Sequence, residues 1–146
     1  IYEYASGGDL EHAVIMMEHQ FQTWTSQQKL QVAYQVASSI ADVHYHASRS
    51  DKSITATTKI KILPSIAHAD IHLNQFIRTS DKLHYKLNDF NRARYLKMDP
   101  TTKQTCPFRF SANNGIFRSP EEYAYLEETE KIDIYSMGNI FYTLLH

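Results

Sequence analysis

The sequence lacks a second cysteine, a long hydrophobic run and an excess of basic residues. Cys106 is the single cysteine among 146 residues, which excludes an internal disulfide and fits a reducing compartment. No apolar stretch reaches the roughly 18 residues of a membrane-spanning helix, and no signal peptide is visible. The net charge of −1 offers no general attraction for nucleic acid. We therefore expect a cytoplasmic segment with no nucleic-acid and no membrane partner.

What the sequence does contain is typical of a globular segment. It is 42% hydrophobic and 21% charged, with ten tyrosines and seven phenylalanines available for a core. The first residue is Ile1 rather than Met, and the last residues, 132–146, form an apolar helical run without a stop signal. We expect both ends to be cut from a longer chain.

Hydrophobic spacing predicts a mainly α-helical fold with a short β-hairpin. A helix is expected over 27–46, where apolar residues recur every three or four positions after Thr25 and Ser26. The polar stretch 47–63, rich in Ser, Thr and Lys, is expected to be an inserted loop, which costs little loop-closure entropy. Two short apolar runs flank the turn at 79–81 and predict a hairpin over 76–87.

Two acidic motifs carry the functional signal. The first reads His-Ala-Asp-Ile-His-Leu-Asn-Gln over 68–75, and the second, Asp-Phe-Asn, begins at Asp89, nineteen residues after Asp70. They resemble the catalytic and metal-binding loops of eukaryotic protein kinases, whose patterns are His-Arg-Asp-Leu-Lys-Pro-x-Asn and Asp-Phe-Gly. Three other stretches resemble further kinase landmarks in family order: a hinge at 2–10, an Ala-Pro-Glu-like boundary at 117–123 and the start of a central helix at 133–138.

The resemblance implies a partial large lobe of a protein kinase-like α+β fold. Its parts would be a hinge over 1–10, catalytic and metal loops over 64–91, an activation segment over 92–121 and a truncated central helix over 132–146. A two-lobed kinase needs about 250 residues. The Gly-rich phosphate loop and the strand lysine of the small lobe are absent from this sequence.

The resemblance also assigns roles around the phosphoryl group. Asp70 would accept the hydroxyl proton of a protein substrate, and His72 would stand where many kinases place a lysine beside the transferred phosphoryl group. Asp89 would bind Mg²⁺ or Mn²⁺, with Gln75 in place of the usual asparagine ligand. A neutral imidazole at His72 is expected to slow turnover.

ATP would bind along the hinge if the resemblance holds. The backbone of Glu3 and Ala5 would bind the adenine, Asp9 would lie near the ribose, and Ile77 would lie under the ring. Backbone contacts of this kind are difficult to lose by mutation.

Three functional hypotheses remain open from the sequence. The protein could be an active kinase that transfers the γ-phosphoryl group of ATP to a protein hydroxyl. It could instead be a pseudokinase that binds nucleotide or acts as a scaffold, since Ala69, His72, Gln75 and Asn91 depart from the family pattern. A third hypothesis takes His68, Asp70 and His72 as a two-histidine, one-carboxylate iron site, although it explains none of the other landmarks.

Overall fold

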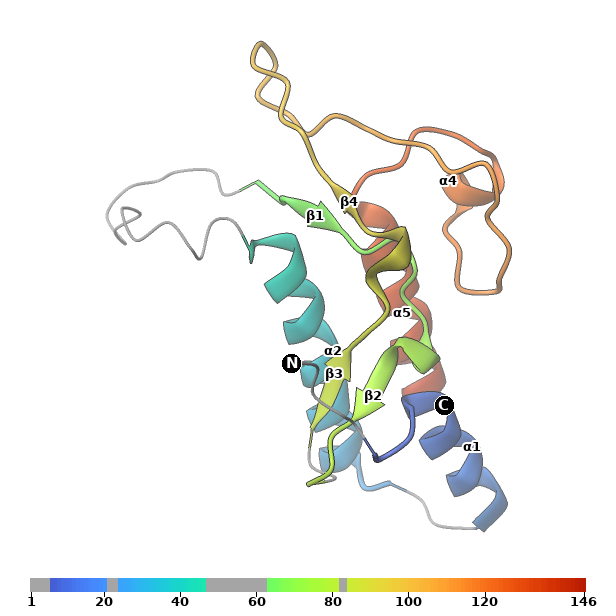
Figure 1. Ribbon diagram of the computed structural model, residues 1–146. Coiled ribbons are helices and arrows are strands. Elements are labelled where there is room, and N and C mark those ends of the chain that lie inside the picture. Colours follow the sequence, from blue (N-terminus) through green and yellow to red (C-terminus); the bar gives the residue numbers. More distant parts are fainter. Residues whose placement is uncertain (1–5, 21–23, 47–62, 82–83) are drawn as a thin grey trace.

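The computed structural model describes residues 6–20, 24–46, 63–81 and 84–146 (Figure 1). Within these ranges the helices and strands follow in this order: α1 (Leu10–Gln20), α2 (Ser26–His44), β1 (Ile66–Ala67), the 3₁₀ turn η1 (Leu73–Gln75), β2 (Phe76–Arg78), β3 (Tyr85–Leu87), the 3₁₀ turn η2 (Phe90–Arg92), β4 (Arg94–Tyr95), α4 (Pro120–Tyr123) and α5 (Lys131–Leu145). The predicted insertion lies outside the described residues except for Leu63.

Helix α2 occupies most of the range predicted for the long helix, and its start follows from local chemistry. The Thr25 hydroxyl accepts the backbone N–H of Gln28 at 3.2 Å, while the Gln28 side chain accepts the backbone N–H of Thr25 at 2.8 Å. This capping box satisfies two N–H groups that a helix start would otherwise leave unpaired. One face of the helix is buried through Val32, Val36, Ile40 and His44.

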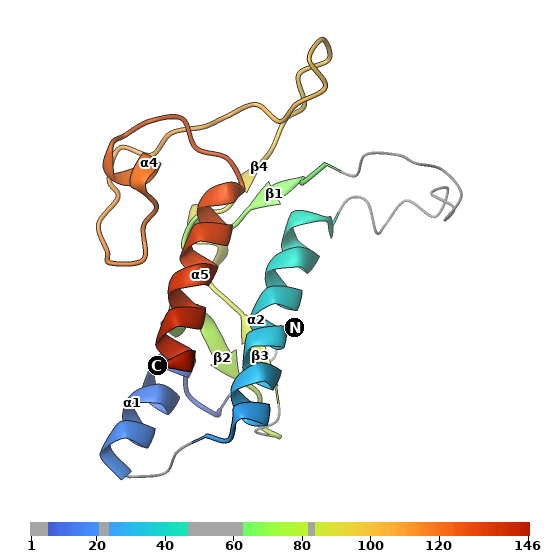
Figure 2. The same ribbon diagram turned by 180° about the vertical axis from the view of Figure 1, so that it is seen from behind.

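The predicted hairpin is present as β2 and β3. The two strands pair antiparallel, with Phe76 opposite Leu87 and Arg78 opposite Tyr85. A second two-stranded ribbon, which the sequence did not predict, pairs β1 with β4 through Ile66 and Tyr95. Figures 1 and 2 show the hairpin on one side of α2 and α5, which contact each other directly.

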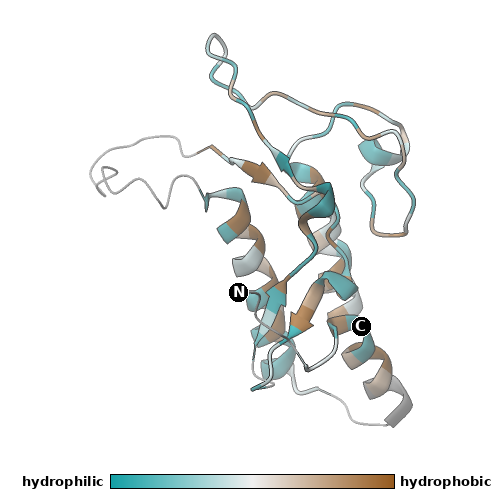
Figure 3. Ribbon diagram, viewed as in Figure 1, coloured by the Kyte–Doolittle hydropathy of each residue, from teal (hydrophilic) through white to brown (hydrophobic). Residues whose placement is uncertain are grey.

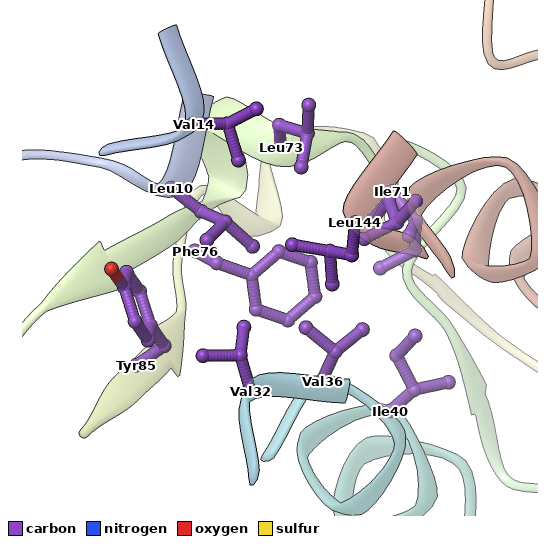
Figure 4. Close-up of a cluster of buried hydrophobic side chains, with 11 residues drawn as sticks. Leu10, Val14, Val32, Val36, Ile40, Ile71, Leu73, Phe76, Tyr85 and Leu144 are labelled. Atoms are coloured by element: carbon purple, nitrogen blue, oxygen red, sulfur yellow. The ribbon is translucent and has the colours of Figure 1, made fainter. Parts of the chain in front are cut away.

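The core forms where the hairpin meets the helices. Phe76 is fully buried, and Figure 4 shows its ring in the middle of the labelled apolar side chains. Figure 3 shows the hydrophobic character of β2 and the alternation of apolar and polar residues along α2. The cluster comprises Leu10, Val14, Val32, Val36, Ile40, Ile71, Leu73, Phe76, Tyr85, Ile140 and Leu144. Because Ile71, Leu73 and Phe76 belong to it, the 68–75 loop is fixed directly on the core.

The stretch from 96 to 119 has few regular elements. Two isolated bridges organise it, Met98 with Thr105 and Phe108 with Glu128. The second bridge ties this stretch to the residues just before α5 through two backbone hydrogen bonds of 2.9 Å. None of the helices in the described ranges is both long enough and apolar enough to cross a membrane.

Candidate functional site

The candidate site is built on the first turn of α5. Asp133 lies there, 1% exposed, and its carboxylate accepts the backbone N–H groups of His68 at 2.7 Å and Ala69 at 2.8 Å. The ring nitrogen Nε2 of His44, at the end of α2, donates to the same carboxylate at 2.8 Å. A carboxylate is stable in this position because the amide dipoles of a helix start favour negative charge. Asp133 thereby fixes the beginning of the 68–75 loop to α2 and α5.

Ala69 has a backbone conformation that is uncommon for a residue with a side chain. Its φ of 62° lies in the left-handed region. Asp133 holds its N–H, and its carbonyl accepts N–H groups from Arg92 and Arg118, each at 3.0 Å. Strained backbone of this kind persists where several surrounding contacts hold it in place, and it is common at functional sites. The strained turn sets the direction of the next residue, Asp70.

Asp70 has polar partners on both carboxylate oxygens. Arg118 Nη2 donates to Oδ1 at 2.5 Å, and the amide nitrogen of Gln75 donates to Oδ2 at 3.1 Å. His72 Nε2 lies 3.7 Å from Oδ2. Burial alone would raise the pKa of Asp70, but the nearby His72 and the hydrogen bond and charge of Arg118 hold the pKa well below its usual range. Asp70 is therefore a carboxylate at neutral pH.

The neighbours of His72 and its burial act on its pKa in opposite directions. The carboxylate of Asp70, 3.7 Å away, raises the pKa of His72, although burial opposes the shift. Its other ring nitrogen, Nδ1, lies 3.1 Å from Oδ1 of Asn74. A protonated His72 would be a better partner for an anionic group than a neutral ring.

Gln75 is buried and points its amide nitrogen into the site. That nitrogen contacts Asp70 and lies 3.2 Å from His72 Nε2, and no donor among the described residues reaches its carbonyl oxygen. The backbone carbonyl of Gln75 accepts the N–H of Asn88 at 2.8 Å, so the residue before Asp89 is bonded to this loop.

Asp89 lies in a left-handed turn at the start of η2, with a φ of 59°. One carboxylate oxygen accepts the N–H of Asn91 at 3.3 Å, and the side chain is exposed. The carboxylate of Asp89 and the carbonyl oxygen of Gln75 are the hard oxygen ligands that Mg²⁺ takes, and Mg²⁺ usually completes its shell with waters and phosphates. Metal binding by these two residues stays a prediction.

Two of the four residues assigned to ATP lie side by side. Asp9 and Ile77 form an antiparallel bridge, flanked by hydrogen bonds of Gly7 and Gly8 with Arg78 at 3.1 and 2.8 Å. One oxygen of Asp9 accepts the N–H of His12 at 2.7 Å and caps α1. Glu3 and Ala5 lie outside the described residues.

A cavity of about 250 Å³ opens beside His72 and Arg118, the polar partners of Asp70. Its wall combines the 68–75 loop, the start of α1 and the segment before α4. The lining residues are Glu11, Ile71, His72, Asn74, Asn114, Gly115, Ile116, Phe117 and Arg118.

Sequence reasoning missed the two arginines of the site. Arg118 precedes Ser119 and Pro120 in the boundary motif, and no spacing rule indicated that it reaches Asp70. Arg92 bonds Ala69, Ala112 and Asn113, lies 4.0 Å from Asp70 and stacks on Phe110 at 4.0 Å. An arginine directly after Asp-Phe-Asn was the one available signal.

The described part of the chain does not arrange His68, Asp70 and His72 as the ligands of an iron ion. His68 directs Nε2 to the carbonyl of Asn88 at 3.0 Å and packs edge-on against Phe90. Among the described residues no group of three or more His, Cys, Asp or Glu side chains is arranged to hold a metal ion.

Comparison with known proteins gives a distant likeness. No family model matches the chain. The chain is 27% identical over 140 residues to wall-associated receptor kinase-like 20 of Arabidopsis thaliana, an alignment that covers 94% of this chain and 19% of that protein. The chain thus spans about a fifth of the length of this curated relative. The comparison relates it distantly to a receptor kinase-like protein.

Proposed function

We propose that the chain is the large-lobe part of a protein kinase-like domain, and that the protein containing it transfers the γ-phosphoryl group of ATP to a protein hydroxyl. The observation that carries the proposal is the environment of Asp70. It is an ionised carboxylate on a strained loop anchored by Asp133, and the same loop is bonded through Gln75 to the residue before Asp89. The likeness to a receptor kinase-like protein supports the same assignment.

Each residue has a defined part in the proposed reaction. The bond between the terminal phosphorus and its bridging oxygen breaks, and ADP leaves with the electron pair. A bond forms between the acceptor hydroxyl oxygen and phosphorus, while Asp70 orients that hydroxyl and takes its proton. Such transition states are loose, so positioning and electrostatics dominate catalysis. Asp89 and Gln75 would hold Mg²⁺, which neutralises phosphate charge when bound.

A pseudokinase is the second candidate, and one observation favours it. Both oxygens of Asp70 already have donors, from Arg118 and Gln75. An incoming hydroxyl would have to share or displace one of them. A pseudokinase would keep nucleotide binding through the hinge and Asp89 but lack transfer.

Nucleotide binding by the full-length protein tests the premise that both candidates share. We expect ATP to raise the unfolding midpoint, more strongly with Mg²⁺ or Mn²⁺, and Asp89→Asn to remove the metal-dependent part. Asp99→Asn is a matched control, because Asp99 is an acidic residue in a remote turn, where it accepts N–H groups from Thr101 and Thr102. ATP binding that ignores metal, or that survives Asp89→Asn unchanged, would remove Asp89 from its assigned role.

Restoring the family residues separates the two candidates. In an active but slow kinase, His72→Lys together with Gln75→Asn should raise kcat by roughly tenfold or more, because the substitutions improve electrostatic stabilisation and metal geometry. If labelled phosphoryl transfer is absent both before and after the double substitution, the pseudokinase assignment is correct.

A further inference from the structure

The partner of Asp70 with the shortest contact comes from outside the 68–75 loop. Arg118 lies forty-eight residues later, in the segment just before α4, and its Nη2 is 2.5 Å from Asp70 Oδ1. The loop's own basic candidate, His72, is 3.7 Å from the other carboxylate oxygen. Arg118 therefore supplies a permanent cation at Asp70 from a different part of the chain.

The hydrogen bonds of Arg118 leave one donor over. A guanidinium has five N–H groups. Within the described part of the chain, Nε bonds the carbonyl of Asn114 at 3.0 Å, Nη1 bonds the Ala69 carbonyl at 3.0 Å and Glu122 at 3.3 Å, and Nη2 bonds Asp70. These four bonds fix the orientation of the planar group. The remaining N–H is on Nη2, the nitrogen that already contacts Asp70.

Arg118 also lines a cavity that a ligand could enter. The Arg118 side chain is 11% exposed, and it lines the 250 Å³ cavity together with His72. Arg92, the other nearby cation, does not line that cavity. Its guanidinium is stacked on Phe110 and bonded to Ala69, Ala112 and Asn113. Arg118 is the better placed of the two for an anionic ligand.

We propose that Arg118 is a catalytic residue of the reaction proposed above, holding Asp70 in position and donating its remaining Nη2–H to the phosphoryl group in transit. The inference rests on the proposed function and adds to it the residue that supplies positive charge to the phosphoryl group. A preorganised donor at developing negative charge contributes most when its own position is fixed beforehand, as the four existing bonds provide. Glu122 and the Ala69 carbonyl are then positioning groups for Arg118.

This assignment differs from the one that the sequence motif implies. His72 stands at the position of the family lysine, and an imidazole loses its charge as pH rises, whereas a guanidinium stays charged. If Arg118 is the main cation, preference for the triphosphate over the diphosphate should persist at alkaline pH. If His72 is the main cation, that preference should fall.

The test uses the full-length protein and compares ATP with ADP affinity by calorimetry, together with kcat for labelled phosphoryl transfer. Arg118→Met should reduce the affinity ratio of ATP to ADP roughly tenfold, because a hydrogen bond to a charged group is lost. It should also reduce kcat by about a hundredfold. His72→Ala should leave the affinity ratio largely intact. Arg109→Met is the matched control, since Arg109 is an exposed arginine paired only with Glu127 among the described residues.

A second variant guards against misfolding. Arg118→Met leaves the buried Glu122 without its cation, which can unfold a protein. Arg118→Gln combined with Glu122→Gln removes both charges and keeps polar groups at both positions, and it should show the same losses. Glu122→Gln alone keeps an acceptor for Arg118 Nη1 and should lose less of the ATP preference than the double variant, as expected of a positioning group.

The outcomes separate the two proposals. A wild-type protein that binds neither nucleotide overturns the proposed function and the role of Arg118 with it. A wild-type protein that prefers ATP and transfers phosphate, with both Arg118 variants unchanged in these properties, overturns the role of Arg118 alone. Loss of the ATP preference in His72→Ala rather than in the Arg118 variants would assign the cation to His72.

Discussion

Asp133 Oδ1 lies 2.8 Å from the backbone nitrogen of Ala69, a residue sixty-four positions earlier that has a left-handed backbone. The contact joins the start of α5 to the loop that carries Asp70. Because Asp133 also accepts from His68 and His44, we expect Asp133→Asn to destabilise the fold by about 3 kcal/mol, since an amide cannot accept on both of its terminal atoms. Urea unfolding of the full-length protein measures this.

Glu127→Gln is the control for that substitution. Glu127 is exposed and pairs with Arg109 at 3.4 Å, so its change should cost less than about 0.5 kcal/mol. Equal effects of the two substitutions would show that Asp133 does not anchor the loop.

The pair of His72 and Asp70 predicts a pH dependence of stability. The nearby carboxylate of Asp70 raises the pKa of His72 in the folded protein, while burial and the charge of Arg118 oppose this shift. The pair therefore stabilises the fold fully below the unfolded pKa of about 6.5, and this contribution is lost as pH rises through the folded pKa. Wild type should exceed His72→Gln in stability by more near pH 6 than near pH 9.

The pKa of the neighbouring His68 shifts in the opposite direction, and its effect on stability cancels when wild type is compared with His72→Gln. Burial lowers the pKa of His68, so its contribution is lost as pH falls, equally in both proteins. Parallel unfolding curves in urea at each pH give the difference. A difference that grows with pH would contradict the assigned pairing.

Two buried glutamates should respond differently to loss of charge. Burial raises the pKa of Glu128, and one of its oxygens has no partner in the described part of the chain. The fold thus disfavours its ionised form, and Glu128 weakens stability as pH rises above its unfolded pKa. Glu128→Gln keeps an oxygen for Asn113 and should raise stability by roughly 1 kcal/mol at pH 7, with a smaller gain at low pH.

Glu122 provides the matched comparison. Its carboxylate accepts from the backbone of Ser119 at 2.8 Å and pairs with Arg118 at 3.3 Å. Glu122→Gln should therefore lower stability at pH 7 by about 2 kcal/mol. Thermal unfolding of both variants at neutral and acidic pH checks the pair. Destabilisation by both substitutions at neutral pH would mean that Glu128 is a favourable charge.

Gly7 tests how closely the segment before α1, which carries Asp9, approaches β2, and Gly138 is the control. A Cβ atom on Gly7 would lie 2.7 Å from the backbone oxygen of Arg78, so Gly7→Ala must push the segment before α1 away from β2. We expect a loss of about 1–3 kcal/mol and weaker ATP binding. Gly138 lies in α5, and a Cβ atom added there would meet no atom within 4 Å, so Gly138→Ala should stabilise by up to about 1 kcal/mol. Thermal unfolding with and without ATP measures the effects of both substitutions. Equal changes in the unfolding midpoint for Gly7→Ala and Gly138→Ala would contradict the close approach of Gly7 to Arg78.

Sequence patterns predicted the elements that depend on interactions between residues close together in the chain. The spacing of apolar residues predicted α2, and two short runs around a turn predicted the β2–β3 hairpin. The hairpin also accounts for the bonding of the stretch before Asp89 to the loop of Asp70. These features depend on neighbours within a few residues or on one tight turn.

The remaining features depend on contacts between distant residues. The ion pair of Arg118 with Asp70 spans forty-eight positions, and Arg118 lies in a stretch with neither helical nor strand periodicity. The left-handed turn at Ala69 was hidden because alanine gives no conformational signal of its own. The β1–β4 ribbon has two residues per strand, too few for an alternation pattern.

Labelled phosphoryl transfer by the full-length protein tests the central claim most directly. We expect transfer from the γ-position of ATP to a protein hydroxyl, and a loss of at least about a hundredfold in Asp70→Asn, because the amide cannot take the hydroxyl proton. Asp99→Asn should retain full activity. Transfer that continues unchanged in Asp70→Asn would contradict the account, because the reaction would then take place at a different group.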